Sequence, residues 1–439
     1  MDMIVLYYRA VMNRKMLPLI RHILVLTLSY LAWSSVANAQ FRVQIQGVGL
    51  TQRPIAIAPF AGRDQVPTPV DAIVMADLER SGLFRRVEVP NLALSENSLP
   101  DFTVLAQTGA DALITGSIQK MNDGRWDIRY RLWDMVSKQD LGGFSFPVTD
   151  ASLRIGAHQI ADSVYEKLTG EKGVFTTRIA YVTKNNSNYH LWVADSDGQG
   201  ASSALSSSQP IISPTWSPDG NRLAYVSFES GKPTIFVHTV STGQRRLVSN
   251  FKGSNSAPAW SPDGKQLIAT LTLSGHSQLY LLDLSSNKPK RISDSSSIDT
   301  EPAWSPDGAW IYFVSDRGGA PHVYRMPSGG GGAERITLNG NYNTSPAISP
   351  NGQHLAYITR ENNQFKLMVM DLASRQVRYL TDTVEDERPS FSANGRMIVY
   401  ATKVAGKEAL MVTTLDGRVR TRLTGEKGDI REPSWGPYR

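Results

Sequence analysis

Residue types that commonly perform chemistry are sparse in this chain, and their spacing matches none of the familiar catalytic motifs. The chain has 439 residues, with seven histidines and no cysteine. The lack of cysteine excludes thiol catalysis, disulfide bonds and zinc held by thiolates. The sequence contains neither Gly-x-Ser-x-Gly nor His-Glu-x-x-His, which are the motifs of α/β-hydrolases and of zinc proteases. It therefore predicts no catalytic residues, no metal site and no cofactor.

Three groups of polar residues could still bind an ion or transfer a proton. The run Glu385-Asp386-Glu387 could serve acid–base chemistry, but we expect a solvated loop. The run Asp195-Ser196-Asp197-Gly198 could contact calcium, but we expect a hairpin turn. His190 and His322 share a repeat position three repeats apart, so we expect loop residues rather than a common metal site.

Composition and charge indicate a globular protein that does not bind nucleic acid. Apolar residues make up 41% of the chain and charged residues 20%, which is ample material for a core. The formal net charge is +6, and residues 1–39 supply half of this excess. The remaining positive charge is too small to indicate a nucleic-acid partner.

The N-terminus has the pattern of an export signal. Basic residues precede an uncharged apolar run at residues 23–33, and Ala37-Asn38-Ala39 supplies the small-x-small pattern of a cleavage site. Cleavage is expected between Ala39 and Gln40. An uncleaved membrane anchor is the alternative, but the apolar run is shorter than the roughly 20 residues of a spanning helix. We therefore expect an exported protein of a bacterial periplasm, without stable membrane insertion.

Behind a tail at residues 40–53, residues 54–170 alternate between predicted strands and helices. Strands are expected at residues 54–60, 110–119, 125–133 and 141–148. Helices are expected at residues 70–84 and 150–168, the second with Asp150 as its N-cap and Gly170 after its end. This order predicts a small α/β domain, followed by a linker at residues 171–177.

An internal repeat fills residues 178–439 and is the strongest signal in the chain. A Pro-x-Trp-Ser-Pro-Asp-Gly motif, complete or weakened, begins at Pro214, Pro258, Pro302, Pro346, Pro389 and Pro433. Four short strands in about 44 residues are typical of a β-propeller blade. The Ser-Pro-Asp-Gly segment fits a tight turn, and the tryptophan before it is expected to pack between blades.

The repeat count predicts how the ring closes. Residues 179–182 repeat the second strand of a blade but have no Pro-x-Trp strand before them, whereas the copy at Pro433 has no second strand after it. Pairing the C-terminal strand with the strand near residue 178 removes both open edges. The predicted fold class is an α/β N-terminal domain plus an all-β six-bladed β-propeller whose C-terminal strand closes the ring.

The connections between successive blades cross one face of the ring and converge on a central funnel. A ring of varied polar side chains there suits the binding of a protein loop, with ordinary solvated loops as the alternative. The candidate binding residues are Ser254, Asn255, Ala257, Thr300, Glu301, Asn343, Thr344, Arg388 and Arg431, and Asp299, Glu387 and Glu432 complete the ring.

The tail offers a second candidate surface. Apolar and polar residues alternate along Phe41, Arg42, Val43, Gln44, Ile45 and Gln46, as in a strand with one buried face. Because glycines follow, this strand could detach and pair with the sheet of a partner. A fixed edge strand of the α/β domain is the alternative.

The signal, the alternating tail, the Arg-Pro-Ile-Ala-Ile-Ala-Pro-Phe strand at residues 53–60 and the Trp-Ser-Pro-Asp-Gly repeats together resemble the TolB family. That family belongs to the Tol–Pal envelope system of Gram-negative bacteria, and the resemblance covers residues 40–439. It implies a non-enzymatic periplasmic scaffold that maintains outer-membrane integrity and supports envelope constriction at cell division.

The resemblance also implies partners. The lipoprotein Pal would bind the propeller mouth, with Ser254, Ala257 and Thr300 as its main contacts, and TolA would bind the tail from Phe41 to Gln46. Pal would order the tail against the body, and colicins bind the mouth of some members. Two other functions stay open: a periplasmic propeller enzyme (a lyase or hydrolase) with its site in the funnel, and a scaffold for outer-membrane protein assembly. The enzyme would need histidines at the axis, and the funnel residues named above include none.

Overall fold

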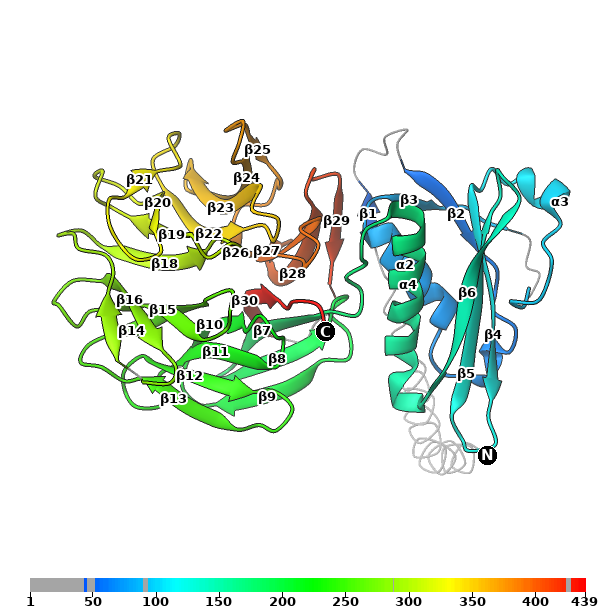
Figure 1. The fold of residues 1–439 in the computed structure, drawn as a ribbon, viewed down its shortest axis with the longest axis horizontal. Coiled ribbons are helices and arrows are strands. Elements are labelled where there is room, and N and C mark those ends of the chain that lie inside the picture. Colours follow the sequence, from blue (N-terminus) through cyan, green and yellow to red (C-terminus); the bar gives the residue numbers. More distant parts are fainter. Residues whose placement is uncertain (1–42, 46–51, 90–93, 287, 424–427) are drawn as a thin grey trace, which may run out of the picture. The chain divides into compact units, whose positions relative to one another are not determined.

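The structure is a computed structural model that describes residues 43–45, 52–89, 94–286, 288–423 and 428–439 (Figure 1). Residues Arg42–Arg439 belong to one compact unit. The predicted signal, its cleavage site at Ala39 and Gln40, and the tail residues Phe41, Arg42 and Gln46 lie outside the described residues.

The α/β domain is a five-stranded mixed sheet covered by helices. Its strands are β2 (Arg53–Ile57), β3 (Phe84–Arg86), β4 (Ala112–Lys120), β5 (Trp126–Asp134) and β6 (Gln139–Val148), in the order β3-β2-β4-β5-β6. Strand β2 runs parallel to β3 and β4, and the other neighbours are antiparallel. The helical elements are η1 (Arg63–Gln65), α2 (Val70–Arg80), α3 (Phe102–Ala106), η2 (Asp150–Ser152) and α4 (Leu153–Thr169).

The two long helices pack on the sheet through apolar faces. Val74 of α2, Ile160 of α4 and Ile128 of β5 are fully buried in one cluster. Helix α4 presents one apolar stripe, whereas α2 is buried around most of its circumference, with residues 73–78 all buried. The predicted strands and helices of this domain are therefore confirmed.

Two helix ends differ from the prediction. Helix α2 ends at Arg80 because Gly82 adopts φ 76°, which turns the chain into β3 at Phe84. Asp150 does not cap α4. It lies in η2 and accepts a hydrogen bond from the indole nitrogen of Trp126 at 2.6 Å. Gly170 closes α4 with φ 76°, as expected.

The described residues from Arg178 onward form six blades of four strands each, numbered here in chain order. Blade 1 contains β7 (Arg178–Asn185), β8 (Asn188–Asp195), β9 (Ser202–Ser207) and β30 (Asp429–Trp435). Blade 2 contains β10 (Ile211–Trp216), β11 (Arg222–Ser227), β12 (Thr234–Thr239) and β13 (Arg245–Ser249). Blade 3 contains β14 (Asn255–Trp260), β15 (Gln266–Leu271), β16 (Gln278–Asp283) and β17 (Pro289–Arg291).

The remaining three blades repeat the same antiparallel order. Blade 4 contains β18 (Asp299–Trp304), β19 (Trp310–Ser315), β20 (His322–Pro327) and β21 (Glu334–Arg335). Blade 5 contains β22 (Asn343–Ile348), β23 (His354–Glu361), β24 (Gln364–Asp371) and β25 (Val377–Tyr379). Blade 6 contains β26 (Glu387–Phe391), β27 (Met397–Val404), β28 (Lys407–Thr414) and β29 (Val419–Arg422).

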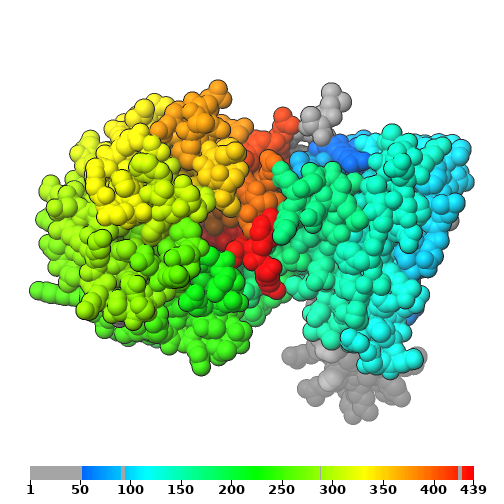
Figure 2. All heavy atoms as spheres, viewed as in Figure 1, coloured from blue at the N-terminus to red at the C-terminus, as the bar shows by residue number. Residues whose placement is uncertain are grey.

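The C-terminal strand closes the ring. Strand β30 pairs antiparallel with β7, with Trp435 opposite Ile179, so the first blade takes its innermost strand from the end of the chain (Figure 1). In Figure 2 the red C-terminal residues reach the surface between the orange and the green parts of the chain. The predicted six-bladed propeller and its closure are confirmed.

Two of the repeat tryptophans join neighbouring blades. The indole nitrogen of Trp260 donates to the carbonyl of Thr215 in blade 2, and that of Trp216 donates to the carbonyl of Ser434 in blade 1, each at 3.2 Å. Because each bond crosses from one blade to the preceding one, Trp216 and Trp260 link their blades as the repeat predicted. The indole nitrogen of Trp435 instead donates to the hydroxyl of Thr177, and that of Trp304 has no partner among the described residues.

The described part of the tail pairs with the propeller. Strand β1 (Val43–Ile45) lies antiparallel to β29, with Gln44 opposite Arg420, and forms a fifth strand of blade 6. The alternative of an edge strand in the α/β sheet is therefore wrong. Alternating polarity predicts a strand with one buried face but not which sheet receives it.

Candidate functional site

One repeated bulge sets the geometry of the propeller axis. In the first strand of each blade, the residue before the repeat proline has a φ between 48° and 56°, and the pairing with the second strand shifts there. These residues are Ser213, Ala257, Glu301, Ser345, Arg388 and Glu432. Such left-handed residues cost roughly 1–3 kcal/mol each. The bulge therefore persists because the surrounding sheet enforces it in all six blades.

Several bulge residues line a cavity of about 430 Å³, together with the repeat prolines of all six blades. Carboxylates tie the blades together there. Glu301 accepts a hydrogen bond from the backbone amide of Ser345 at 2.6 Å. Glu432 accepts one from the amide of Ser213 at 3.1 Å and pairs with Arg388 at 2.6 Å. Glu301 and Arg388, two of the predicted binding residues, thus act within the ring.

Two other predicted binding residues are buried and hold the crossing loops. The side chain of Asn255 donates to the carbonyls of Phe251 and Gly253 at 3.0 and 3.1 Å and accepts from the amide of Phe251. Asn343 donates to the carbonyl of Asn339 at 2.8 Å. Both residues are at most 1% exposed, and their amide groups hold the loops that form the mouth. The sequence alone could not show this, because the acceptors are backbone carbonyls.

The other predicted mouth residues are more accessible. Ser254, Ala257, Thr300 and Thr344 are half-buried, whereas Arg431 is exposed; all five lie in first strands or just before them. The Thr300 hydroxyl accepts from the hydroxyl of Thr270 at 3.3 Å. The side chain of Arg431 is 54% exposed.

Four exposed apolar side chains lie on the same face, in loops of successive blades. Ile298, Leu338 and Val384 lie in connections that enter first strands, and Leu273 lies between the second and third strands of blade 3. Because blade strands alternate in direction, both kinds of loop reach one face. Leu338 is 71% exposed and Ile298 52%. Large apolar side chains grouped on one face commonly mark a protein-binding surface.

A second cavity, called here the mouth pocket, opens on this face with a volume of about 440 Å³. Its lining comes from blades 5, 6 and 1: Thr344, Ser345, Ile358, Asn363, Phe365, Glu385, Asp386, Glu387, Ala401, Thr402, Lys403, Glu408, Ile430 and Arg431. Asp386 is buried and Glu387 half-buried, so the expectation that all three acidic residues form a solvated loop is wrong. Repeat reasoning did not identify this pocket, because its walls combine first strands with second and third strands and with the loops between them.

The mouth pocket contains one carboxylate, that of Glu387, with a buried oxygen that lacks a hydrogen-bond partner among the described residues. Burial raises the pKa of Glu387, and the neighbouring charge of Glu432 raises it further, against a weaker lowering by Arg431 and Arg388. The oxygen without a partner is Oε1.

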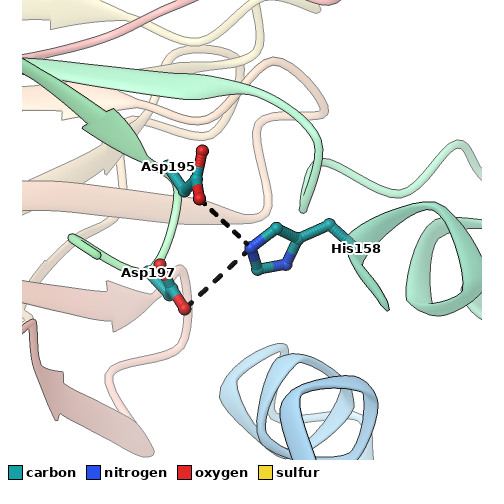
Figure 3. A group of neighbouring side chains, drawn as sticks. All are labelled: His158, Asp195 and Asp197. Carbon is teal, nitrogen blue, oxygen red and sulfur yellow. Dashed lines mark ion pairs between the residues drawn. The ribbon is translucent and has the colours of Figure 1, made fainter. Parts of the chain in front are cut away.

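A cluster of possible metal ligands lies between helix α4 and blade 1 (Figure 3). His158, Asp195 and Asp197 offer ligand atoms within 4.8 Å of one another. Cationic side chains of the protein already pair with these carboxylates. Arg154 contacts Asp197 at 2.7 Å and Asp195 at 3.4 Å, and the second ring nitrogen of His158 meets Asp77 at 2.6 Å.

A protonated His158 supplies a further positive charge to this cluster. Burial disfavours its charge, but Asp77, Asp195 and Asp197 outweigh burial and raise the pKa of His158 to about 10. With Arg80 bonded to Asp77 at 2.6 Å, three cations face three carboxylates. The cluster is therefore an ion-pair network that joins α2 and α4 to the end of β8 and the turn after it. The predicted hairpin turn at residues 195–198 is confirmed by the pairing of β8 with β9.

The histidines expected in loops lie in strands. His190 belongs to β8, and His322 is buried in β20, where its Nε2 atom accepts from Arg335 at 2.7 Å. Their predicted position in loops is wrong. Neither of the two cavities described above is lined by a histidine. No helix within the part of the chain that the structure describes is long and apolar enough to cross a membrane.

Two family models match the chain. Residues 165–439 match the TolB beta propeller domain, and residues 41–141 match the TolB amino-terminal domain. The Tol-Pal system protein TolB of a Polaromonas species is 64% identical over 404 residues, which cover 92% of this chain and 95% of the relative. The protein of the same name from Aromatoleum aromaticum is 63% identical over 417 residues, or 95% of this chain and 97% of the relative.

A solved structure agrees with these matches. The crystal structure of TolB from Acinetobacter baumannii superposes with a TM-score of 0.83 at 37% identity. The match covers 91% of this chain and 99% of that one. Sequence and fold thus agree over both domains.

Proposed function

This chain belongs to the TolB family of the Tol–Pal system, and from that membership we propose that it is a non-enzymatic periplasmic scaffold. In this proposal Pal binds the propeller mouth, TolA binds the N-terminal tail, and the assembly maintains outer-membrane integrity and supports envelope constriction at cell division. Colicins are further candidate ligands of the mouth.

The observation that carries the proposal is the set of exposed apolar side chains around the polar mouth. Four large apolar side chains are exposed there: Ile298, Leu338, Val384 and Leu273. Burying such a side chain away from water lowers the free energy, so a partner that covers them would bind more tightly. A polar ring with apolar anchors is the usual anatomy of a protein interface. The absence of histidine from the lining of both cavities counts against a lyase or hydrolase in the funnel.

Within the mouth, the geometry divides the predicted residues into two groups. Ser254, Ala257, Thr300, Thr344 and Arg431 are the proposed Pal contacts. Asn255, Asn343, Glu301 and Arg388 are proposed to fix the shape of the surface, because their polar atoms bond within the ring.

The tail proposal rests on the pairing of β1 with β29. Three described residues of β1 pair with β29. A three-residue strand at the edge of a sheet contributes little stability. An equilibrium between a docked and a released tail is therefore accessible. Only the released strand would offer its backbone to TolA.

The test introduces charge into the apolar mouth. Ile298→Asp and Leu338→Asp should each weaken the binding of the soluble domain of Pal at least about tenfold in calorimetric titration, because a carboxylate must be desolvated on docking. Val136→Asp is the matched control, since Val136 is 73% exposed but lies between β5 and β6 of the α/β domain. Equal affinity in all three variants would move the Pal site away from the mouth.

A further inference from the structure

The mouth pocket has a composition that selects a particular kind of side chain. Its walls include the apolar side chains Phe365, Ile358 and Ile430, whereas carboxylates of Glu385, Glu387 and Glu408 also line it. We propose that this pocket receives a lysine or arginine side chain of the protein that docks on the mouth. The proposal rests on the function proposed above, because it names the chemistry of one contact within that interface.

Charge supports a cationic occupant. Four carboxylates line the pocket, at Glu385, Asp386, Glu387 and Glu408, against the two cations Lys403 and Arg431. Lys403 lies against Glu385 and 3.9 Å from Glu408. Arg431 pairs with Asp429 at 3.6 Å. No lysine or arginine among the described residues makes an ion pair of 4.0 Å or less with Glu387.

Asp386 is not free to take the occupant. Its carboxylate accepts from the backbone amide of Leu367 at 2.9 Å and from the hydroxyls of Thr381 and Thr383. These bonds pin the loop that presents Glu385 and Glu387 to the pocket. The carboxylate that remains for a ligand is therefore that of Glu387.

Two buried polar atoms in the pocket wall have no hydrogen-bond partner within the described part of the chain. They are Oε1 of Glu387 and the hydroxyl of Thr402, a residue only 3% exposed. Buried polar atoms are normally satisfied, so each unsatisfied atom calls for a ligand or another explanation. Both atoms accept hydrogen bonds, and ammonium and guanidinium groups are donors without acceptors.

The shape of the pocket fits the same occupant. Lysine and arginine place an aliphatic stem along apolar surface and keep a charged head among polar groups. Phe365, Ile358 and Ile430 would contact the stem, while Glu387 and Thr402 would bond the head. An acidic occupant is disfavoured by the excess of carboxylates, and a purely apolar one would leave both acceptors unpaired.

The first test compares variants of the pocket. Glu387→Gln should weaken the binding of soluble Pal at least about tenfold, because it removes one charge of a desolvated pair. Thr402→Val keeps the shape but removes the hydroxyl. It should lower the affinity while leaving the melting temperature unchanged or raised, since an unpaired buried hydroxyl destabilises the free protein. Glu334→Gln, on the exposed hairpin of blade 4, is the control and should bind like the unmodified chain.

The second test identifies the partner side chain. Each lysine and arginine of the Pal surface is replaced by methionine, and each replacement is combined with Glu387→Gln in a double-mutant cycle. Replacing one particular basic residue of Pal should lower the affinity of Pal for the unmodified chain at least about tenfold. The same replacement should hardly change the affinity of Pal for the Glu387→Gln variant.

The outcomes separate this inference from the proposed function. In one outcome, Pal binds the unmodified chain, binds Ile298→Asp more weakly and binds Glu387→Gln equally well. That result would support the mouth as the Pal site and refute the docking of a basic side chain in the mouth pocket. If Glu387→Gln weakens binding but no basic residue of Pal couples to it, the inference is also overturned. If the unmodified chain does not bind Pal, both proposals fall.

Discussion

Replacing His158 by leucine should loosen the attachment of α4 to blade 1, and the size of the effect follows from the ion-pair network. His158 is fully buried and its two ring nitrogens face Asp77 at 2.6 Å and Asp195 and Asp197 at 3.8 and 4.0 Å. His158→Leu leaves three carboxylates with two cations. Removing one member of a buried ionic group costs about 3–5 kcal/mol.

The pH dependence gives a second measure of the same network. The pKa of His158 is about 10 in the folded chain, against 6.5 for an unperturbed histidine. Because the folded value is the higher one, the stabilisation is complete below pH 6.5 and is lost as pH rises towards 10. The loss amounts to about 1.4 kcal/mol per pH unit in this window.

The assay is urea unfolding of the unmodified chain and of the variant between pH 6 and pH 9. The difference in unfolding free energy between the two should be largest at pH 6 and shrink as pH rises. His190→Gln is the control, because the ring of His190 bonds Ser206 and lies beside the ring of Trp192, and neither residue belongs to the network. A His158→Leu variant with unchanged stability, or with a difference that does not vary with pH, would refute the protonated network.

Three further predictions concern the mouth, the tail and the blade contacts. Thr300→Glu should weaken Pal binding at least about tenfold without changing the melting temperature, and retained affinity would place the site elsewhere. Deleting residues 41–46 should abolish TolA binding while sparing Pal, and unaltered TolA binding would rule out the tail as its site. Trp260→Ala should lower the unfolding free energy by about 3–5 kcal/mol, because a packed indole and its bond to Thr215 are lost; an unchanged melting curve would contradict its role between blades.

The propeller could be predicted from the sequence because its signals are local and repeated. Each blade carries a proline, a tryptophan and a Pro-Asp-Gly turn at fixed spacing, or a weakened copy of them. The unmatched copies at residues 179–182 and at Pro433 were enough to predict closure, since a sheet edge left open is unfavourable. The pairing of β30 with β7 confirms this reasoning.

The parts that sequence reasoning missed depend on contacts between distant residues. Asp77 and His158 are 81 residues apart, and Arg154 and Asp197 are 43 apart, so no motif announces their network. Strand β3 has only three residues, too few for a periodic pattern. The roles of Asn255 and Asn343 follow from burial, which a list of polar loop residues does not reveal.

The central claim is that the propeller mouth binds Pal. Its most direct test is calorimetric titration of the chain from Gln40 to Arg439 with the soluble domain of Pal from the same organism. We predict saturable one-to-one binding that Ile298→Asp weakens and Val136→Asp does not. No binding at high concentration of two folded proteins would contradict the account.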